Sequence, residues 1–495
     1  MNRRQIGAID LGASGGRVMG AGYDGERLFM KELHRFANEP VVFNGTMYWD
    51  ILRLFHEIKI GLVAAGRQGG ADSVSVDTWG VDFGLLDAEG RLMENPVHYR
   101  DGRTKGMVSR VLEKIPGESL YRLTGNQIME INTLFQLYSL AEQRPEFLSR
   151  ADTLLMMPDL ILYALSGIRC SECSIASTSQ LLDAGTGQWA EKLLGRLHIP
   201  GRLFQPVVRS GTRLGSLREE LKRELGIGSV EVIATAGHDT QAAMAAVPAE
   251  EDDFIFISCG TWALVGTELD RPIISRESMK YNVTNELGCG GRVSFLRNLT
   301  GTWLIQESRR QWKREGREYT FGQLEELAEK AERFKALIDP DAGEFASTGH
   351  MPERIRQAAR KTGQHIPDSE GEIIRCIDES LAFKYRSAVE EIKACTGREY
   401  RRIYLVGGGA QSRLLCQMTA NACNLPVTAG PVEATAAGNM GIQLMALGEL
   451  ADMGELRDMI RRSFPLAQYE PENTGEWEEQ YQRFRGLYSG GEYED

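Results

Sequence analysis

The sequence has 495 residues, 42% of them hydrophobic and 25% charged, as in ordinary globular proteins, and at this length we predict two or three domains. The formal net charge of −12 argues against nucleic acid or an anionic membrane as partner, because both require a basic face. No apolar signal core follows Arg3 and Arg4, and the apolar run 154–165 is short and contains Asp159. We therefore expect neither secretion nor a membrane span.

The eight cysteines are sparse and scattered, which indicates reduced thiols in the cytoplasm. Cys170 and Cys173 form a C-x-x-C pair, but no second pair or histidine follows at metal spacing. We assign this pair no metal or redox function.

Residues 6–18, IGAIDLGASGGRV, place a turn with three glycines between two apolar runs. This pattern predicts two strands that meet in a tight hairpin, with Asp10 at its rim. Without side chains in the way, successive backbone N–H groups of such a turn can bind phosphate. Taken alone, the same pattern also fits an ordinary glycine hairpin.

The next elements continue this beginning with a strand over 28–36, a helix and two further strands. Asp50 is expected to cap the helix, which buries Ile51, Leu54, Phe55, Ile58 and Leu62 and ends at Gly66. Strands are predicted over 73–77 and 81–86. The order β-β-β-α-β resembles the ribonuclease-H-like half of the actin and hexokinase superfamily.

Residues 100–225 are predicted to be mostly helical, followed by a strand over 231–234 and a small-residue helix over 241–246. Residues 254–266, FIFISCGTWALVG, then repeat the strand, turn and strand of the beginning. Two hairpins roughly 250 residues apart divide the chain into halves of similar length.

The final third alternates a loop, a strand and two helices. A polar surface excursion is predicted over 340–372, a strand over 402–406, a helix over 412–423 and a last helical run over 434–447.

Two glycine hairpins, one per half, could hold a polyphosphate through amides. The sequence contains no G-x-x-x-x-G-K-[ST], so a P-loop is excluded, and the first hairpin lacks the G-x-G-x-x-G spacing of a dinucleotide site. Asp10 could hold a water-ligated Mg²⁺ that also binds the phosphates, or it could simply cap the turn.

Asp239 is the candidate general base, because phosphoryl transfer needs a carboxylate that orients a hydroxyl and accepts its proton. His238 and Thr240 flank it among small residues. The alternative is a cap of the following helix, for which aspartate and threonine are both common.

Two other segments could contact ligands. Asp77, Trp79 and Asp82 lie around a short turn and could bind sugar hydroxyls and a sugar face, although Trp79 could equally belong to the core. Residues 407–409, three glycines before a helix, could receive adenine and ribose or form a plain turn. For the charged loop 99–104 we favour internal pairing over ligand contact.

Together these residues resemble the FGGY carbohydrate kinases along nearly the whole chain. The resemblance rests on motifs in the same order: Ile9–Arg17, Val76–Asp87, Tyr99–Thr104, Gly237–Thr240, Ser258–Trp262, Asn298–Gln306 and Val406–Gly409. The run D-T-W-G-V-D-F at 77–83 resembles the branch of the family that acts on L-rhamnulose, since glycerol and xylulose kinases carry other residues there.

The resemblance implies an α/β fold of two ribonuclease-H-like domains of the actin/hexokinase superfamily, 1–247 and 248–495, with an interdomain cleft. The first would hold the sugar site and the first phosphate hairpin, and the second the nucleotide site. It implies a transferase that moves the γ-phosphate of ATP to the 1-hydroxyl of L-rhamnulose in rhamnose breakdown. The cofactors would be ATP and Mg²⁺.

The same resemblance assigns individual residues. Asp239 matches the proton acceptor, and Asp10 would hold Mg²⁺ through water. The residues matching sugar contacts are Gly80, His238, Thr240 and Asn298, to which the turn chemistry adds Asp82. The residues matching nucleotide contacts are Ala13, Ser14, Gly15, Gly16, Arg17, Thr261, Gln306 and Gly408.

Two alternatives stay open at this point. The kinase could act on another ketose or polyol, such as L-fuculose or L-xylulose. Less in keeping with the sequence, the fold could serve as a non-catalytic ATP-dependent switch. In each case we expect a cytoplasmic monomer or homodimer that binds small molecules and neither nucleic acid nor membrane.

Overall fold

The computed structural model describes residues 4–488. Its contacts divide the chain into two units. Unit 1 comprises the residues up to Pro248 together with Glu268–Phe295 and Ala434–Phe464, and unit 2 comprises Ala249–Thr267, Leu296–Glu433 and the residues from Pro465 onward. These units follow spatial contacts, and the division into domains 1–247 and 248–495 stays a prediction.

Unit 1 is built on a six-stranded sheet in the order β13-β14-β6-β1-β2-β3. Its strands are β1 (Arg4–Gly12), β2 (Gly15–Tyr23), β3 (Leu28–Ala37), β6 (Ser73–Thr78), β13 (Thr212–Ser216) and β14 (Glu231–Ala234). Strands β1 and β2 pair antiparallel as far as Gly12 and Gly15, which leaves Ala13 and Ser14 as the turn. The predicted first hairpin is therefore confirmed.

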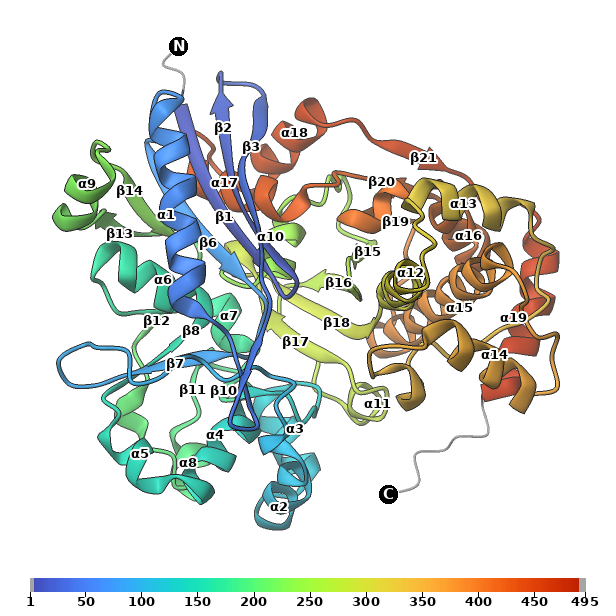
Figure 1. The fold of residues 1–495 in the computed structure, drawn as a ribbon, viewed down its shortest axis with the longest axis horizontal. Coiled ribbons are helices and arrows are strands. Elements are labelled where there is room, and N and C mark those ends of the chain that lie inside the picture. Colours follow the sequence, from blue (N-terminus) through green and yellow to red (C-terminus); the bar gives the residue numbers. More distant parts are fainter. Residues whose placement is uncertain (1–3, 489–495) are drawn as a thin grey trace. The chain divides into compact units, whose positions relative to one another are not determined.

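Helices cover one face of this sheet with apolar side chains. Helix α1 (Ile51–Arg67) begins after Asp50, whose side chain accepts a hydrogen bond from the Arg53 amide as predicted. Figure 1 shows α1 lying along the strands of this sheet. Its apolar side chains pack with those of α6 (Met157–Ser166) on Val74 and Val76, in one buried core. Because side chains alternate along a strand, the residues between these valines face the other side.

The opposite face contacts α10 (Asp239–Ala245) and α17 (Ala434–Ala446), both rich in alanine and glycine. Gly438 of α17 lies so close to α10 that a Cβ there would fall 1.8 Å from the Ala242 carbonyl oxygen. The small residues that the sequence shows in these two helices thus permit a close backbone contact.

The remaining part of unit 1 holds a second core under short helices and strand pairs. The predicted strand 81–86 is β7 (Phe83–Leu86), which pairs with β8 (Thr153–Met156) in a separate sheet and does not extend the central one. The residues around Pro40 form a small hairpin, β4 (Val41–Phe43) and β5 (Thr46–Tyr48).

The mostly helical character predicted for 100–225 is confirmed. Besides α6, its α-helices are α2 (Met107–Lys114), α3 (Gly117–Thr124), α4 (Thr133–Gln143), α5 (Pro145–Arg150), α7 (Cys173–Ser177), α8 (Glu191–Arg196) and α9 (Glu219–Leu225). The short strands between them are β9 (Ser171–Glu172), β10 (Leu182–Asp183), β11 (Gln188–Trp189) and β12 (Val207–Val208). Later in the chain, α11 (Arg276–Lys280), β17 (Thr284–Leu287) and α18 (Met453–Ser463) also belong to unit 1.

The second sheet has seven strands in the order β17-β18-β16-β15-β19-β20-β21. Strands β15 (Phe254–Cys259) and β16 (Trp262–Leu269) form the predicted second hairpin, and β19 (Arg402–Val406) runs parallel to β15. The other strands are β18 (Val293–Thr300), β20 (Val427–Ala429) and β21 (Ala467–Tyr469).

Unit 2 also contains α12 (Trp303–Arg314), α13 (Phe321–Lys330), α14 (Met351–Lys361), α15 (Glu370–Thr396), α16 (Arg413–Cys423) and α19 (Thr474–Tyr488). The predicted polar excursion over 340–372 is wrong in part, because α14 lies there and buries Met351, Ile355 and Ala359. The run 434–447 is also not the last helix, since α18 and α19 follow it.

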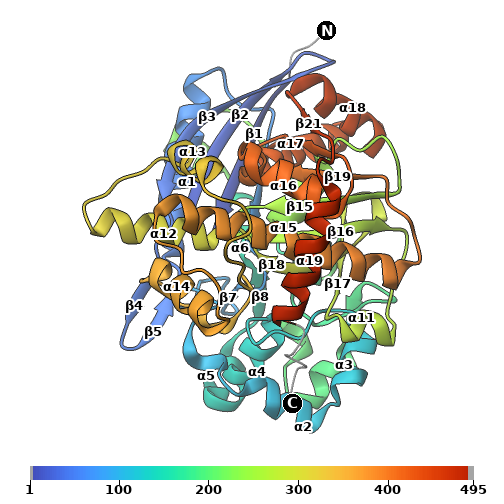
Figure 2. The same cartoon turned by 90° about the vertical axis from the view of Figure 1, so that its right-hand side faces the viewer.

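Helix α19 packs on α15 and α16 within unit 2 (Figure 2). Its buried residues, Trp477, Tyr481 and Phe484, share one face at spacings of four and three, although charged residues between them lower its overall hydrophobicity. None of the helices among residues 4–488 is both long and apolar enough to span a membrane.

Candidate active site

Two aspartates lie side by side where parallel strands of unit 1 end. Asp10 of β1 and Asp77 of β6 are register partners, so their side chains emerge on the same face of the sheet. Arg17 of β2 lies opposite Asp10, and its Nη2 donates to the Asp10 Oδ2 at 2.6 Å. The permanently charged guanidinium thus neutralises one member of this pair.

Asp77 is completely buried, and a residue of α17 fixes its side chain through a hydrogen bond. Its Oδ2 accepts a hydrogen bond from the Asn439 Nδ2 at 2.5 Å, and the Asn439 Oδ1 accepts one from the Gln443 Nε2 at 2.8 Å. Gln443 in turn accepts from the Ser73 hydroxyl and donates to the Gly7 carbonyl. Sequence reasoning missed Asn439 and Gln443. The signal for them was a pair of amide side chains four residues apart in a helix of small apolar residues.

The Asp77 Oδ1 is buried without a hydrogen-bond partner among the described residues. Burial, together with the negative charges of Asp10 and Asp239, raises the pKa of Asp77 well above its usual range. Three carboxylates in one electrostatic neighbourhood repel each other, so the site favours a cation or a proton.

Asp239 is the first residue of α10, two residues before the predicted start of that helix at 241, and His238 is the residue before the helix. The Thr240 amide donates to the Asp239 Oδ1 at 2.6 Å, and the Asp239 side chain remains 32% exposed. Desolvation raises the pKa of Asp239, while the neighbouring His238 opposes that rise. Of the three carboxylates, Asp239 is therefore the most exposed to solvent.

His238 is buried between two acids. Its Nδ1 lies 2.9 Å from the Glu286 Oε2, and its Nε2 lies 3.4 Å from the Asp239 Oδ1. Burial lowers the pKa of His238, but Glu286, Asp239 and Glu172 together outweigh burial and bring this pKa to about 9. The ring is thus a cation near neutral pH, with an N–H directed to each acid.

Glu172, which sequence reasoning missed, holds the backbone that leads to Asp239. Its Oε2 accepts from the amides of Gly237, Ser174 and Ile175. The Ser174 hydroxyl, which donates to the same oxygen, accepts from the His238 amide at 3.2 Å. The buried Glu172 carboxylate, with its several donors, fixes the loop before α10. No local motif could have revealed its contact with this loop.

Asp82 is also fully buried, and the chain's own donors occupy it. Its Oδ2 accepts from the indole N–H groups of Trp49 and Trp79 at 2.6 and 2.9 Å, and its Oδ1 from the Gln136 amide at 3.0 Å. Burial raises the pKa of Asp82 to about 6. This geometry suits a residue that shapes the 79–82 turn, and direct sugar contact by Asp82 stays a prediction.

Trp79 belongs to the core, and side chains of the charged loop 99–104 pair within the protein. Both were alternatives that the sequence left open. Trp79 is buried, with its ring centroid 4.0 Å from that of Trp49. In the loop, the Asp101 side chain accepts from the Met47 and Arg103 amides, and Arg103 donates to Gln136.

Unit 2 brings together the predicted nucleotide residues that it contains. The Thr261 hydroxyl lies 3.3 Å from the Gln306 side-chain oxygen, at the turn between β15 and β16. The glycine run 407–409 approaches the end of β15, where a Cβ on Gly409 would fall 2.4 Å from the Cys259 sulfur. Asn298 lies half-buried on β18.

The acidic group of unit 1 fits Mg²⁺ of the type that keeps water and phosphate ligands. No cluster of three or more His, Cys, Asp or Glu side chains within 4–488 is arranged to hold a metal by itself. Mg²⁺ needs only one or two carboxylates when phosphates and waters complete its shell. Asp10, beside the unpartnered Oδ1 of Asp77, provides a negative environment of that kind.

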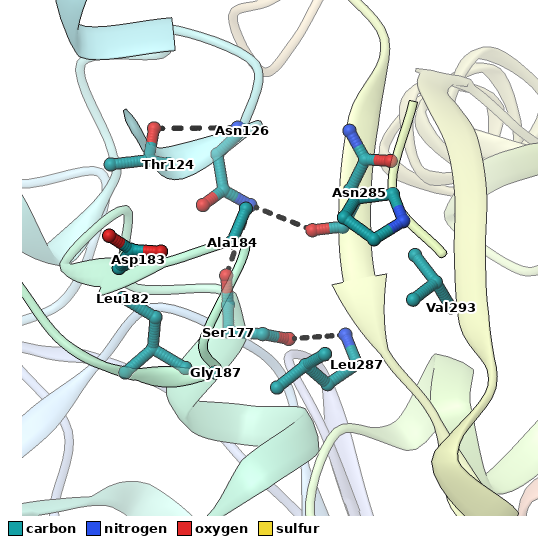
Figure 3. Close-up of a pocket in the computed structure, with 11 residues that line it drawn as sticks. Thr124, Asn126, Ser177, Leu182, Asp183, Ala184, Gly187, Asn285, Leu287 and Val293 are labelled. Carbon is teal, nitrogen blue, oxygen red and sulfur yellow. Dashed lines mark hydrogen bonds between the residues drawn. The ribbon is translucent and has the colours of Figure 1, made fainter. Parts of the chain in front are cut away.

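A separate pocket of unit 1 lies beside β17 (Figure 3). Asn285 and Leu287 of this strand line it, with residues from 124–126 and 177–187 opposite. Its acid, Asp183, accepts hydrogen bonds from the amides of Gly185 and Thr186. None of the predicted site residues lines this pocket, so we do not assign it as the active site.

Comparison with known proteins gives two family matches that follow each other along the chain. The N-terminal domain of the FGGY family of carbohydrate kinases matches residues 5–246, and the C-terminal domain of that family matches residues 255–447.

Relatives of similar length extend these matches. A rhamnulokinase of Bacteroides thetaiotaomicron is 40% identical over 97% of this chain and 98% of its own. A rhamnulokinase of Halalkalibacterium halodurans is 39% identical over 93% and 98% of the two chains. Among solved structures, a gluconate kinase from Lactobacillus acidophilus superimposes with a TM-score of 0.81 at 16% identity, covering 99% of this chain and 98% of its own.

Proposed function

Because the chain belongs to the FGGY family of carbohydrate kinases and has the two-domain α/β fold of that family, we propose that it transfers the γ-phosphate of ATP to the 1-hydroxyl of L-rhamnulose. The observation that carries the choice of sugar is the 40% identity to a rhamnulokinase across 97% of the chain. The run D-T-W-G-V-D-F at 77–83 supports the same choice. The reaction would be a step in rhamnose breakdown.

Asp239 is the proposed general base. Its partly exposed carboxylate would accept the proton of the sugar hydroxyl as the hydroxyl oxygen attacks the γ-phosphorus. The bond from that phosphorus to the oxygen bridging to the β-phosphate breaks, and ADP leaves. His238, Thr240, Gly80, Asp82 and Asn298 are the proposed sugar-binding residues.

The nucleotide would be held through backbone amides and a metal ion. We assign Asp10 to Mg²⁺, which when bound neutralises charge on the phosphates. Arg17 keeps Asp10 oriented through their ion pair. The proposed nucleotide contacts are Ala13, Ser14, Gly15, Gly16, Arg17, Thr261, Gln306 and Gly408.

The proposal includes a cytoplasmic setting and small-molecule partners. The eight cysteines, which all lie within 4–488, form no disulfide with one another, and this supports a reducing compartment. Sugar and ATP would be the ligands, and the chain would act as a monomer or homodimer.

A panel of acceptors tests the function. ADP release is measured with and without Mg²⁺ on L-rhamnulose, L-fuculose, L-xylulose and glycerol. We expect the highest kcat/KM on L-rhamnulose and no turnover without Mg²⁺. A higher kcat/KM on another ketose would replace the proposed substrate, and ADP release that no acceptor stimulates would contradict the transfer reaction.

The variant Asp239→Asn tests the proposed base. It keeps the size of the side chain but removes its basicity, so turnover should fall by about 10²-fold or more while sugar binding by calorimetry persists. Asp458→Asn, on the exposed face of α18, is the matched control and should turn over like the parent. Unchanged turnover of Asp239→Asn would remove this residue from the mechanism.

A further inference from the structure

Glu286 is a buried acid that none of the recognised motifs contains. It lies on β17 and is only 5% exposed. Side chains alternate along a strand, and the neighbouring Asn285 and Leu287 line the pocket of Figure 3. Glu286 therefore points to the opposite face, where it contacts α10 and the residue before that helix.

The Glu286 carboxylate organises two side chains there. Its Oε2 lies 2.9 Å from the His238 Nδ1 and accepts a hydrogen bond of 2.9 Å from the Gln241 Nε2. The other end of Gln241 accepts from the Ser294 hydroxyl at 2.7 Å, which fixes the orientation of the amide. The acid is thus held by a network in which each partner has a defined role.

Hydrogen bonds of the two neighbouring residues fix strand β17 on both sides of Glu286. The amide and side chain of Asn285 both donate to the Gly125 carbonyl at 2.9 Å. The Leu287 amide donates to the Ser177 hydroxyl at 3.0 Å, as Figure 3 shows. The Asn126 side chain donates to the Asn285 carbonyl. These bonds hold the Glu286 backbone in place, so the carboxylate is presented to His238 in a defined position.

We propose that Glu286 is a positioning residue for phosphoryl transfer, which orients the His238 ring through Nδ1 and so directs its Nε2–H toward the Asp239 carboxylate. The inference rests on the function proposed above, in which Asp239 accepts the proton of the sugar hydroxyl. The resulting line of carboxylate, imidazolium and carboxylate spans 2.9 Å on one side of the ring and 3.4 Å on the other.

The surroundings of Asp239 explain why such a cation is needed. Asp10 on β1 acts on Asp239, Glu172 on β9 acts on His238, and Asp77 on β6 interacts with both Asp10 and Asp239. Burial and the nearby acid Asp10 both raise the pKa of Asp239, which favours a proton on it and opposes its action as a base. A protonated His238, whose pKa lies at about 9, keeps the carboxylate ionised.

The variant Glu286→Gln removes the negative charge of this side chain and keeps its shape. Its side-chain oxygen can still accept from His238 and Gln241, but it carries no charge. In the substrate-free protein, ¹⁵N NMR of the histidine rings should find both nitrogens of His238 protonated near pH 7 in the parent and one of them unprotonated in Glu286→Gln. Glu57→Gln is the matched control, because Glu57 also pairs with a histidine, His34, at 2.6 Å on α1.

Kinetics with pH provide the second readout. At about pH 6, kcat of Glu286→Gln should fall at least about tenfold, and the deficit should shrink toward pH 9, where Asp239 ionises without help. A role confined to folding would lower kcat by a constant factor at all pH values. Glu57→Gln should follow the parent at every pH.

A third variant covers the case in which Glu286→Gln does not fold. His238→Asn keeps a donor for Glu286 but has no charge, and it should show the same pH-dependent loss of kcat. Doubly protonated His238 in Glu286→Gln, or a pH-independent deficit in both variants, would overturn the inference. The NMR experiment uses no sugar, so its result does not depend on whether L-rhamnulose is the substrate. An error in the L-rhamnulose assignment would be detected separately, by the acceptor panel on the parent enzyme.

Discussion

At the scale of single residues, the aspartates of unit 1 differ through their partners. Asp10 has a guanidinium, Asp77 has an amide and an unpartnered oxygen, and Asp239 has an imidazole and access to solvent. The first arrangement places a positive charge beside the carboxylate, and the second opposes a negative charge on it. The third leaves a carboxylate whose protonation its neighbour controls, which suits a base.

Asp378 of α15, in unit 2, is another buried carboxylate that lies close to other acids. Burial and the nearby Glu325 and Glu379 raise the pKa of Asp378 to about 8. Between about pH 4 and pH 8 the folded state therefore binds this proton more tightly than the unfolded state does. As pH rises through that window, this group contributes a loss of folding stability.

We accordingly predict that Asp378→Asn becomes more stable relative to the parent as pH rises from 5 to 8, by at most about 1.4 kcal/mol per pH unit. Urea unfolding of both proteins at several pH values measures the difference. Exposed Asp458→Asn serves as control and should show no such trend. A constant difference between Asp378→Asn and the parent across this range would rule out a titrating Asp378.

At the scale of elements, the contact between α10 and α17 determines where Asp239 begins its helix. Helix α17 carries Asn439 and Gln443, which bind Asp77 and the backbone of β1, and it touches α10 at Gly438. The two helices thus link the buried polar face of the sheet to the candidate base. Any side chain at 438 must separate them.

Gly438→Ala should therefore lower both stability and activity. The new methyl group meets backbone, 1.8 Å from the Ala242 carbonyl oxygen, so we expect a loss of at least about 2 kcal/mol and a fall in kcat. Gly322→Ala is the matched helix control, since nothing lies within 4 Å of its Cβ, and it should be neutral or stabilising by up to about 1 kcal/mol. Denaturant unfolding and turnover measure both, and a Gly438→Ala protein equal to the parent would contradict the close contact.

The elements also show how far sequence reasoning reaches. The two hairpins, the Asp50 cap and the strand 402–406 depend on local patterns and were predictable. Helix α14 was missed because charged residues separate its few buried ones, and α19 for the same reason. The pairing of β7 with β8 joins segments about seventy residues apart, which no local pattern encodes.

The candidate site divides in the same way. Short local motifs were sufficient to identify Asp10, His238, Asp239 and the glycine turns. Glu172, Glu286 and Asn439 bond residues that lie 65, 48 and 362 positions away, so these roles depend on topology. For Asp82, residue type suggested a sugar ligand, whereas its occupied oxygens indicate a support for the turn.

At the scale of the whole molecule, each half of the chain begins its sheet with a glycine hairpin. The first is β1 and β2 in one sheet, and the second is β15 and β16 in the other. Two family domains match these halves in order. Lysine is absent from both turns, so any phosphate contact made by either turn would come from its backbone amides.

The position of the transferred phosphate tests the central claim most directly. Purified protein is mixed with Mg²⁺, ATP and L-rhamnulose, and the product is examined by ¹H–³¹P correlation NMR, with Asp239→Asn run in parallel. The account predicts one new phosphate monoester whose phosphorus couples to the C1 protons, formed by the parent and not by the variant. A phosphate on another carbon, inorganic phosphate alone, or equal product from Asp239→Asn would contradict it.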